Sequence, residues 1–233
     1  MTTPYTEKMA AYKTPEYHPA FEEYCEAIFE LHEDDVEVIQ ARIAERLDVS
    51  RPAVSEMIHR MNREGLVEID KAVSLTPAGR ELAESVVRRH RLAERFLTDV
   101  LHLSWAEAHT EAGKWEHVIS PSVEVAMNRL LGEPTTCPHG NPIPGSSYVS
   151  DPEAVSLDSI PVGEQFTVRR ITEELEFTDG LLEFLEDASI QPGIIGSIAS
   201  TAPDGTTTIE IGERAVGIGA FVASRILVSP GTD

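Results

Sequence analysis

The spacing of apolar residues changes once along this 233-residue chain, and the change limits the folds that it can adopt. Between residues 20 and 131, apolar residues recur at intervals of three and four, which is the pattern of amphipathic helices. Beyond residue 161 they fall in short β-rich runs separated by glycine-containing turns, which is the pattern of a small β-barrel. A stretch rich in proline and glycine, 132–161, indicates a linker between them. The sequence therefore predicts a mainly α fold with a small C-terminal β-barrel.

Capping and breaking residues predict where the elements begin and end. The first 20 residues show little periodicity and are expected to form an extended arm. Ser104-Trp105-Ala106-Glu107 has the form of a capping box, so a helix is predicted to begin there, and Ser120-Pro121 is predicted to cap the next one. We expect helices over 20–33, 38–47, 50–65, 76–101, 104–119, 120–132 and 179–187, and strands over 66–69, 73–75, 165–171, 194–200, 206–211 and 220–228.

Residues 38–75 have the order helix, short turn, helix and hairpin, which is the order of a winged helix-turn-helix. Ser50 suits an N-cap, Pro52 suits the first turn, and Gly65 suits a left-handed residue that ends the helix. The alternative is two amphipathic helices and a hairpin in an unrelated α+β domain. If the domain reads DNA, the side chains that face it are expected to be Ser50, Arg51, Pro52, Ala53, Ser55, Glu56, Arg60 and, at the hairpin tip, Lys71.

The net charge of −21, from 40 Asp and Glu against 19 Lys and Arg, excludes a protein that coats nucleic acid. Phosphate binding gains its affinity from basic side chains. The charge is uneven, however. Residues 38–71 hold six basic and six acidic side chains and are neutral, whereas residues 151–233 hold 15 acids and four Arg, a net of −11. Binding to DNA is therefore expected only through the neutral segment.

Three of the predicted helices carry His and Glu at spacings that place them on one face. They form a pair four residues apart, a pair three apart, and a set at i, i+7 and i+8. Such residues could converge on a divalent cation, and the absence of a thiolate favours Mn²⁺ or Fe²⁺ over a structural zinc. Each pair alone is usually a solvated surface pair, and only the three sets together favour a metal site. The candidate ligands are Glu23, Glu26, His90, Glu94, His109, Glu116 and His117.

The two cysteines, Cys25 and Cys137, are too few for a disulfide framework. Cys25 lies among helical residues and is expected only to pack. Cys137-Pro138-His139 could bind a metal, but we favour an ordinary structural linker. The N-terminus lacks a basic flank followed by an apolar segment, and no apolar run reaches the roughly 18 residues of a membrane span. The sequence thus predicts a cytoplasmic protein with no membrane partner.

Five motifs, in order along the chain, resemble those of the diphtheria-toxin-repressor family of iron- and manganese-dependent regulators. They are Ala41-Arg42-Ile43-Ala44-Glu45-Arg46-Leu47, Val54-Ser55, Arg89-His90-Arg91-Leu92-Ala93-Glu94-Arg95, Trp115-Glu116-His117 and Gly140-Asn141-Pro142-Ile143-Pro144-Gly145. The C-terminal part is similar, more loosely, to the SH3-like domain of the longer members. The resemblance implies an arm and winged helix-turn-helix over 1–76, a helical dimerisation and metal-binding domain over 77–145, a linker over 146–160 and an SH3-like domain over 161–233.

The resemblance also implies a metal-activated repressor that binds palindromic operator DNA as a homodimer, with one or two dimers on each operator. Matched by position, the ancillary metal site would consist of His90, Glu94 and His109. The primary site, which activates DNA binding, would contain Glu116 and His117. In the barrel, Glu176 or Asp179 would add to the ancillary site.

The remaining primary-site positions depart from the family pattern. Glu23 falls where iron-type members have Met and manganese-type members have Asp, and Glu26 falls where manganese-type members place a second carboxylate. Gly113 occupies a position that is usually Cys in iron sensors and Glu in manganese sensors. Either the Gly113 backbone carbonyl, a water, Glu26 or Glu111 replaces that side chain, or the primary site is weaker or rearranged. Because Cys and Met donors are absent, Mn²⁺ is our first choice and Fe²⁺ the second.

Two other classes of protein remain as alternatives. A metal-dependent enzyme would need a nucleophile with an adjacent base or a phosphate loop, and the sequence offers neither, so we do not expect an enzyme. A metal-independent winged-helix regulator would bind DNA with an affinity that a chelator leaves unchanged. In the metal-dependent case, a cation would neutralise the clustered carboxylates and dock the first helix against the dimerisation helices.

Overall fold

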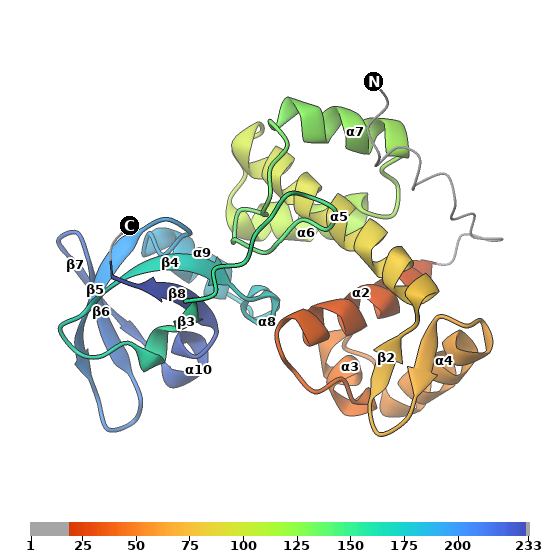
Figure 1. Cartoon of the computed structure of the whole chain (residues 1–233), viewed down its shortest axis with the longest axis horizontal. Helices are drawn as coiled ribbons and strands as arrows, with labels where there is room; N and C mark the ends of the chain where they lie inside the picture. The colour runs from red at the N-terminus through yellow and green to blue at the C-terminus, as the bar shows by residue number, and fades with distance from the viewer. Residues whose placement is uncertain (1–18, 232–233) are drawn as a thin grey trace. The chain divides into compact units, whose positions relative to one another are not determined.

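The structure is a computed structural model that describes residues 19–231 (Figure 1). The predicted N-terminal arm lies outside the described residues, apart from its last two positions. The chain divides into two compact units, of which the first comprises residues 19–93 with 112–133 and the second 94–111 with 134–231. Each unit has its own buried apolar core. In the part of the chain that the structure describes, no helix is long and apolar enough to cross a membrane.

The first unit contains the predicted helix-turn-helix with its wing. Ile28, Ile43 and Ile58, one from each helix, are completely or almost completely buried in a common core, and the two wing strands pair antiparallel with Val67 opposite Leu75. The prediction of a winged helix-turn-helix is confirmed. Its elements are α2 (Pro19–Glu33), α3 (Gln40–Arg46), α4 (Arg51–Arg63), β1 (Val67–Ile69) and β2 (Val73–Leu75).

Local hydrogen bonds explain why the elements stop where they do. The Ser50 hydroxyl accepts from the Ala53 amide at 3.4 Å and caps α4, which Gly65 follows with a left-handed φ of 75°. Thr76 then caps the next helix, because its hydroxyl accepts from the Gly79 amide at 3.1 Å. A Cβ on Gly79 would lie 2.0 Å from the Leu66 carbonyl oxygen, so only glycine allows this helix to pack so closely against the wing.

Three further helices follow: α5 (Pro77–Asp99), which carries His90 and Glu94, α6 (Trp105–Trp115), which carries His109, and α7 (Pro121–Leu130). The capping box is confirmed, since the Ser104 amide donates to Glu107 at 3.1 Å and the Glu107 amide donates to the Ser104 hydroxyl at 3.4 Å. Helix α6 ends at Trp115, earlier than expected, so Glu116 and His117 follow the helix. Ser120 is the N-cap residue of α7 and Pro121 begins the helix, as predicted. The Ser120 side chain makes no capping hydrogen bond to the described part of α7, however, and its hydroxyl lies 3.1 Å from the Ser122 hydroxyl.

The second unit contains a six-stranded antiparallel sheet with the order β3-β8-β4-β5-β6-β7. Two of our expectations for it were wrong. Strand β7 was missed because Gly217 interrupts its apolar pattern, and the run 220–228 begins as a helical turn before its strand starts. The elements are β3 (Val155–Ser156), β4 (Gln165–Ile171), α8 (Glu173–Glu176), α9 (Leu181–Asp187), β5 (Ile195–Thr201), β6 (Thr207–Ile211), β7 (Arg214–Ile218), α10 (Ala220–Ala223) and β8 (Ile226–Pro230), with a 3₁₀ turn at Leu157–Ser159.

The proline-rich segment before the sheet is packed rather than free. The His139 carbonyl accepts from the Ile171 amide of β4 at 2.8 Å, and the Asn141 side chain donates to the Ile171 carbonyl at 3.0 Å. A Cβ on Gly140, whose φ is +92°, would lie 2.3 Å from the Arg169 carbonyl oxygen. Glycine at this position therefore lets the segment lie directly on β4, which fixes the residues on either side of it.

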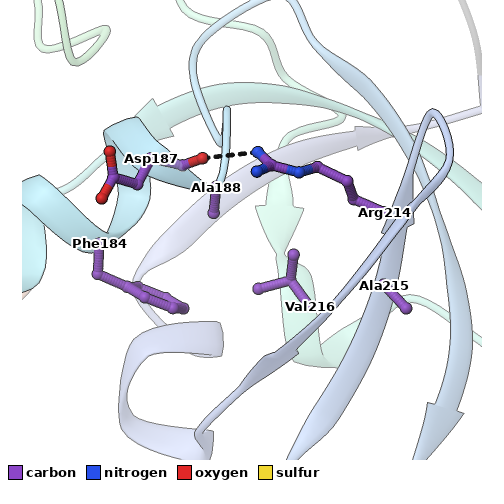
Figure 2. Close-up of a pocket in the computed structure, with 6 residues that line it drawn as sticks. All are labelled: Phe184, Asp187, Ala188, Arg214, Ala215 and Val216. Atoms are coloured by element: carbon purple, nitrogen blue, oxygen red, sulfur yellow. Dashed lines mark hydrogen bonds between the residues drawn. The ribbon is translucent and has the colours of Figure 1, made fainter.

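A hollow of about 340 Å³ lies beside the edge strand β7 (Figure 2). The Arg214 guanidinium closes one side by donating to the Asp187 carbonyl at 2.8 Å. The lining residues are Phe184, Asp187, Ala188, Arg214, Ala215 and Val216. They include one carboxylate and no His or Cys, so this hollow is not a candidate metal centre.

Candidate metal centre

Four predicted ligands of the first unit lie together, and we name them the helix cluster: Glu26, His90, Glu116 and His117. Glu26, His90 and Glu116 each place one ligand atom within 4.8 Å of the others. The carboxylate of Glu116 contacts both imidazoles, because its Oε2 lies 2.5 Å from His90 Nδ1 and its Oε1 lies 3.1 Å from His117 Nε2. Helices α2 and α5 and the turn after α6 therefore meet at Glu116.

Two carboxylates of the helix cluster, those of Glu26 and Glu116, have little contact with water. Burial raises the pKa of Glu26 well above its ordinary value, and the charges of Glu116 and Glu30 raise it further. Its Oε1 is buried and has no hydrogen-bond partner among the described residues. Two buried carboxylates need a proton or a cation between them. Oxygen and nitrogen donors of this kind fit a divalent ion such as Mn²⁺ or Fe²⁺.

Glu22 was not predicted to take part, yet it contacts the helix cluster. Its Oε2 lies 2.7 Å from His117 Nδ1, and this hydrogen bond raises the pKa of His117 although burial lowers it. Glu23, the predicted ligand, is exposed, but its charge also raises the pKa of His117, and its ligand role remains a prediction. Periodicity alone did not separate these two neighbours, because which of them meets His117 depends on how α2 packs.

Gly113 leaves open space on α6. A Cβ at this position would meet no atom of the described residues within 4 Å. The position is four residues before His117, one helical turn away. The structure thus holds no side-chain donor here and has room for one.

A second group, the linker cluster, lies within the second unit and consists of Glu94, His109, His139 and Glu176 with Cys137. His109 Nδ1 lies 3.1 Å from Glu94 Oε1 and 3.2 Å from Glu176 Oε2. His139 Nδ1 lies 2.9 Å from the same Glu176 oxygen and 3.7 Å from Glu94 Oε1. The structure therefore brings Glu94 and His109 together as predicted, with His90 one helical turn before Glu94 on α5.

Two members of the linker cluster come from the segment that we interpreted as an ordinary linker. Cys137, His139 and Glu94 are fully buried and offer ligand atoms within 4.8 Å of one another. Burial lowers the pKa of His139, but the carboxylates of Glu176 and Glu94 outweigh it, so the pKa is raised. In the sequence, the Cys-x-His spacing was the signal for these two residues. The packing of their segment on β4 brings them close to Glu94 and Glu176.

The barrel supplies Glu176 rather than Asp179. Asp179 is exposed, whereas the Glu176 carboxylate is buried and fixed at its second oxygen by the Asn141 side chain, which donates at 2.7 Å. Arg170 in turn donates to the Asn141 oxygen. The linker cluster is therefore held by a second layer of hydrogen bonds, as metal ligands usually are.

The predicted DNA-contacting residues are accessible. Seven of the eight are exposed, and Ser55 is half-buried. The Arg60 guanidinium lies 5.0 Å from the centre of the Phe21 ring, so this side chain also braces α4 against α2. The exposed side chains are Ser50, Arg51, Pro52, Ala53, Glu56, Arg60 and Lys71.

Comparison with known proteins agrees with this architecture. Residues 17–74 match the domain described as "Iron dependent repressor, N-terminal DNA binding domain", and residues 76–145 match "Iron dependent repressor, metal binding and dimerisation domain". The chain belongs to the iron-dependent repressor family. Residues 155–230 match the FeoA domain, which corresponds to the predicted SH3-like barrel. The protein is thus a DNA-binding repressor of a metal-dependent family and not an enzyme, as the sequence predicted.

Individual relatives cover most of the chain. It is 41% identical over 207 residues to the iron-dependent repressor IdeR of Mycobacterium tuberculosis, covering 84% of this chain and 90% of IdeR. It is 40% identical over 182 residues to the diphtheria toxin repressor of Corynebacterium glutamicum, covering 74% and 80%. Among solved structures, a manganese-dependent transcriptional repressor in complex with manganese has a TM-score of 0.80 at 31% identity, covering 90% of this chain and 99% of that one. The manganese regulator SloR has a TM-score of 0.72 at 30% identity, covering 94% and 100%.

Proposed function

We propose that this protein is a Mn²⁺- or Fe²⁺-activated repressor that binds palindromic operator DNA as a homodimer. The observation that carries the proposal is the helix cluster, in which Glu26 and Glu116 are held together with two imidazoles. Relatives described as iron-dependent and manganese-dependent repressors support the choice of ions. A repressor of this kind would act in the cytoplasm, where its operator lies.

The primary metal site would be the helix cluster, with Glu23 as a further ligand. A bound divalent cation would supply positive charge between carboxylates that otherwise repel one another. Glu26 belongs to α2, which shares a buried core with α3 and α4. A change in how α2 docks would therefore change how α4 is presented to the major groove. Metal and DNA then favour the same conformer, which is the condition for allosteric activation.

The linker cluster would be the ancillary site. His90, Glu94 and His109 were predicted for it, with Glu176 or Asp179 from the barrel. His90 contacts Glu116 of the helix cluster, and His139 and Cys137 are further neighbours of Glu94. We expect occupancy to hold the barrel and the proline-rich segment to the C-terminal half of α5, because these elements contribute the donors.

A homodimer is supported by apolar side chains that the chain leaves exposed near α7. Val118 is 73% exposed and Leu130 is 65% exposed, and Val123 and Val125 are also exposed. These four residues lie close together in the sequence, and an interface between two copies would remove exposed apolar side chains from water. Two copies would place two α4 helices on the two halves of a palindrome.

Operator binding titrated with metal tests the proposal. An operator would first be selected from random DNA with the Mn²⁺-loaded full-length protein, and affinity would then be measured by fluorescence anisotropy under anaerobic conditions. We expect Mn²⁺ or Fe²⁺ to strengthen binding at least about tenfold, the lower range of typical allosteric coupling, and a chelator to reverse it. Affinity that neither ion nor chelator alters would instead indicate a metal-independent regulator.

A further inference from the structure

We propose that Glu22 positions His117 for metal binding and thereby connects the metal centre to α2. The inference rests on the proposed function only in that a divalent cation binds the helix cluster. Glu22 is not one of the ligands that the sequence predicted, and it contacts the cluster from outside.

The two nitrogens of His117 face different carboxylates. Nδ1 lies 2.7 Å from Glu22 Oε2, and Nε2 lies 3.1 Å from Glu116 Oε1. An ionised carboxylate only accepts hydrogen bonds, so Glu22 selects the form of the ring that carries its proton on Nδ1. Nε2, which faces Glu116, is then the nitrogen whose lone pair would hold a cation once its proton is lost. Ligating histidines commonly donate their other N–H to a carboxylate, which fixes the tautomer and makes the ligand more basic.

Glu22 is itself held in place, which a positioning residue requires. It is only 8% exposed, and it follows Phe21, which is buried in the core of the first unit. Arg89 of α5 lies 3.7 Å from its other oxygen. Arg89, Glu22 and His117 thus form a chain of charged groups that joins α5, the first turn of α2 and the turn after α6.

The same helix contributes two carboxylates with different tasks. Glu26 lies one turn after Glu22 on α2 and enters the helix cluster directly, whereas Glu22 contacts the far side of His117. Once Nε2 of His117 is coordinated, its Nδ1–H becomes a stronger donor, so the bond to Glu22 tightens. The first turn of α2 is then docked more firmly, and α2 shares its core with α4.

The opposite role is a latch, in which Glu22 competes with the metal for His117. The two roles predict opposite signs for one measurement. Removal of a positioning carboxylate weakens metal binding, because the ring loses its orientation. Removal of a latch strengthens it, because a competing partner is gone.

Calorimetric titration of the full-length protein with Mn²⁺ distinguishes them. We expect Glu22→Ala to raise the Kd of the helix cluster about 10- to 100-fold, the usual cost of losing such a partner. Glu22→Gln keeps an amide oxygen that accepts from Nδ1–H, so its Kd should lie between that of the wild type and that of Glu22→Ala. Glu81→Ala removes an exposed carboxylate from α5 and should leave the Kd unchanged. An equal or lower Kd for Glu22→Ala would overturn the proposal.

A spectroscopic measurement separates positioning from a loss of folding. Long-range ¹H–¹⁵N spectra of histidine-labelled protein loaded with Zn²⁺ should show the proton of His117 on Nδ1 in the wild type and in Glu22→Gln. If Glu22→Ala does not fold, Glu22→Gln alone decides, and an unchanged Kd would refute the role. A wild type that binds no Mn²⁺ would refute the proposed function itself, whereas wild-type binding with an indifferent Glu22 refutes only this inference.

Discussion

The helix cluster and the linker cluster use the same residue types but are built differently. Helices and one turn supply the helix cluster, whose His117 side chain remains 13% exposed. In the linker cluster the side chains of His139 and Glu176 are at most 1% exposed, whereas His109 remains 15% exposed. The linker cluster also has a thiol, with Cys137 Sγ 3.8 Å from His139 Nδ1. The first arrangement can respond to a change in helix docking, and the second fixes segments in place.

Their supporting residues show the same difference. Glu176 is held by Asn141, which Arg170 holds in turn, so the linker cluster has uncharged and charged donors behind its carboxylate. The helix cluster has Glu22 behind His117, and Glu22 belongs to the helix that would move. The support of the linker cluster thus lies on the proline-rich segment and β4, whereas the support of the helix cluster lies on α2, the helix that the proposed activation would shift.

The largest effect is expected when one candidate ligand is removed from each cluster, which tests whether the two clusters have different roles. We expect Glu116→Ala to abolish the Mn²⁺-dependent gain in operator affinity, about tenfold or more, because Glu116 contacts both histidines of its cluster. His139→Ala should remove one equivalent of bound metal and keep most of this gain. Metal stoichiometry by mass spectrometry and operator binding by anisotropy would measure both.

Equal losses from the two substitutions would contradict this division of labour. Thermal unfolding of both metal-free variants provides the control for folding. A Glu116→Ala variant that still responds to Mn²⁺ like the wild type would remove the helix cluster as the activating site.

The second prediction concerns pH, with metal binding and metal-free stability changing in opposite directions. The pKa of His117 is raised in the folded protein, first by the hydrogen bond to Glu22. Its ion pair therefore stabilises the metal-free fold below the unfolded value of about 6.5, and this contribution is lost as pH rises through the raised pKa. A protonated imidazole cannot bind metal, so Mn²⁺ affinity should increase up to about tenfold per pH unit over the same window.

The His139→Ala variant removes one other group with a raised pKa; the raised pKa of Glu26 in the helix cluster contributes with the same sign as that of His117. In this variant, the unfolding midpoint of the metal-free protein should fall slightly between about pH 6.5 and 8 while Mn²⁺ binding strengthens. Mn²⁺ affinity that stays constant across this range would exclude His117 as a ligand.

The sequence predicted the DNA-reading domain more completely than the metal centre. Ser50, Gly65 and the short wing are local signals, and caps and turns depend on neighbours along the chain. The contact of His139 with Glu176 depends on how a proline-rich segment packs on β4, and no pattern within either segment carries that information. Similarly, Glu22 and Glu23 are adjacent, and only the docking of α2 decides which one meets His117.

The smallest expected effect concerns Gly113, the one predicted ligand position without a side chain. It tests whether the helix cluster lacks a donor there. Gly113→Ala should stabilise the protein by about 0.5–1 kcal/mol, since alanine favours a helix interior over glycine and its Cβ would meet nothing within 4 Å in the described part of the chain. It should leave the Mn²⁺ Kd unchanged. Gly113→Glu adds a carboxylate one turn before His117 and should lower the Kd of the helix cluster severalfold relative to Gly113→Ala, with no change at the linker cluster. Calorimetry on this matched pair removes the helix-propensity effect from the comparison. A Gly113→Glu variant that binds Mn²⁺ no better than Gly113→Ala would show that the helix cluster already has its full set of donors, with Gly113 as spare volume rather than a missing ligand.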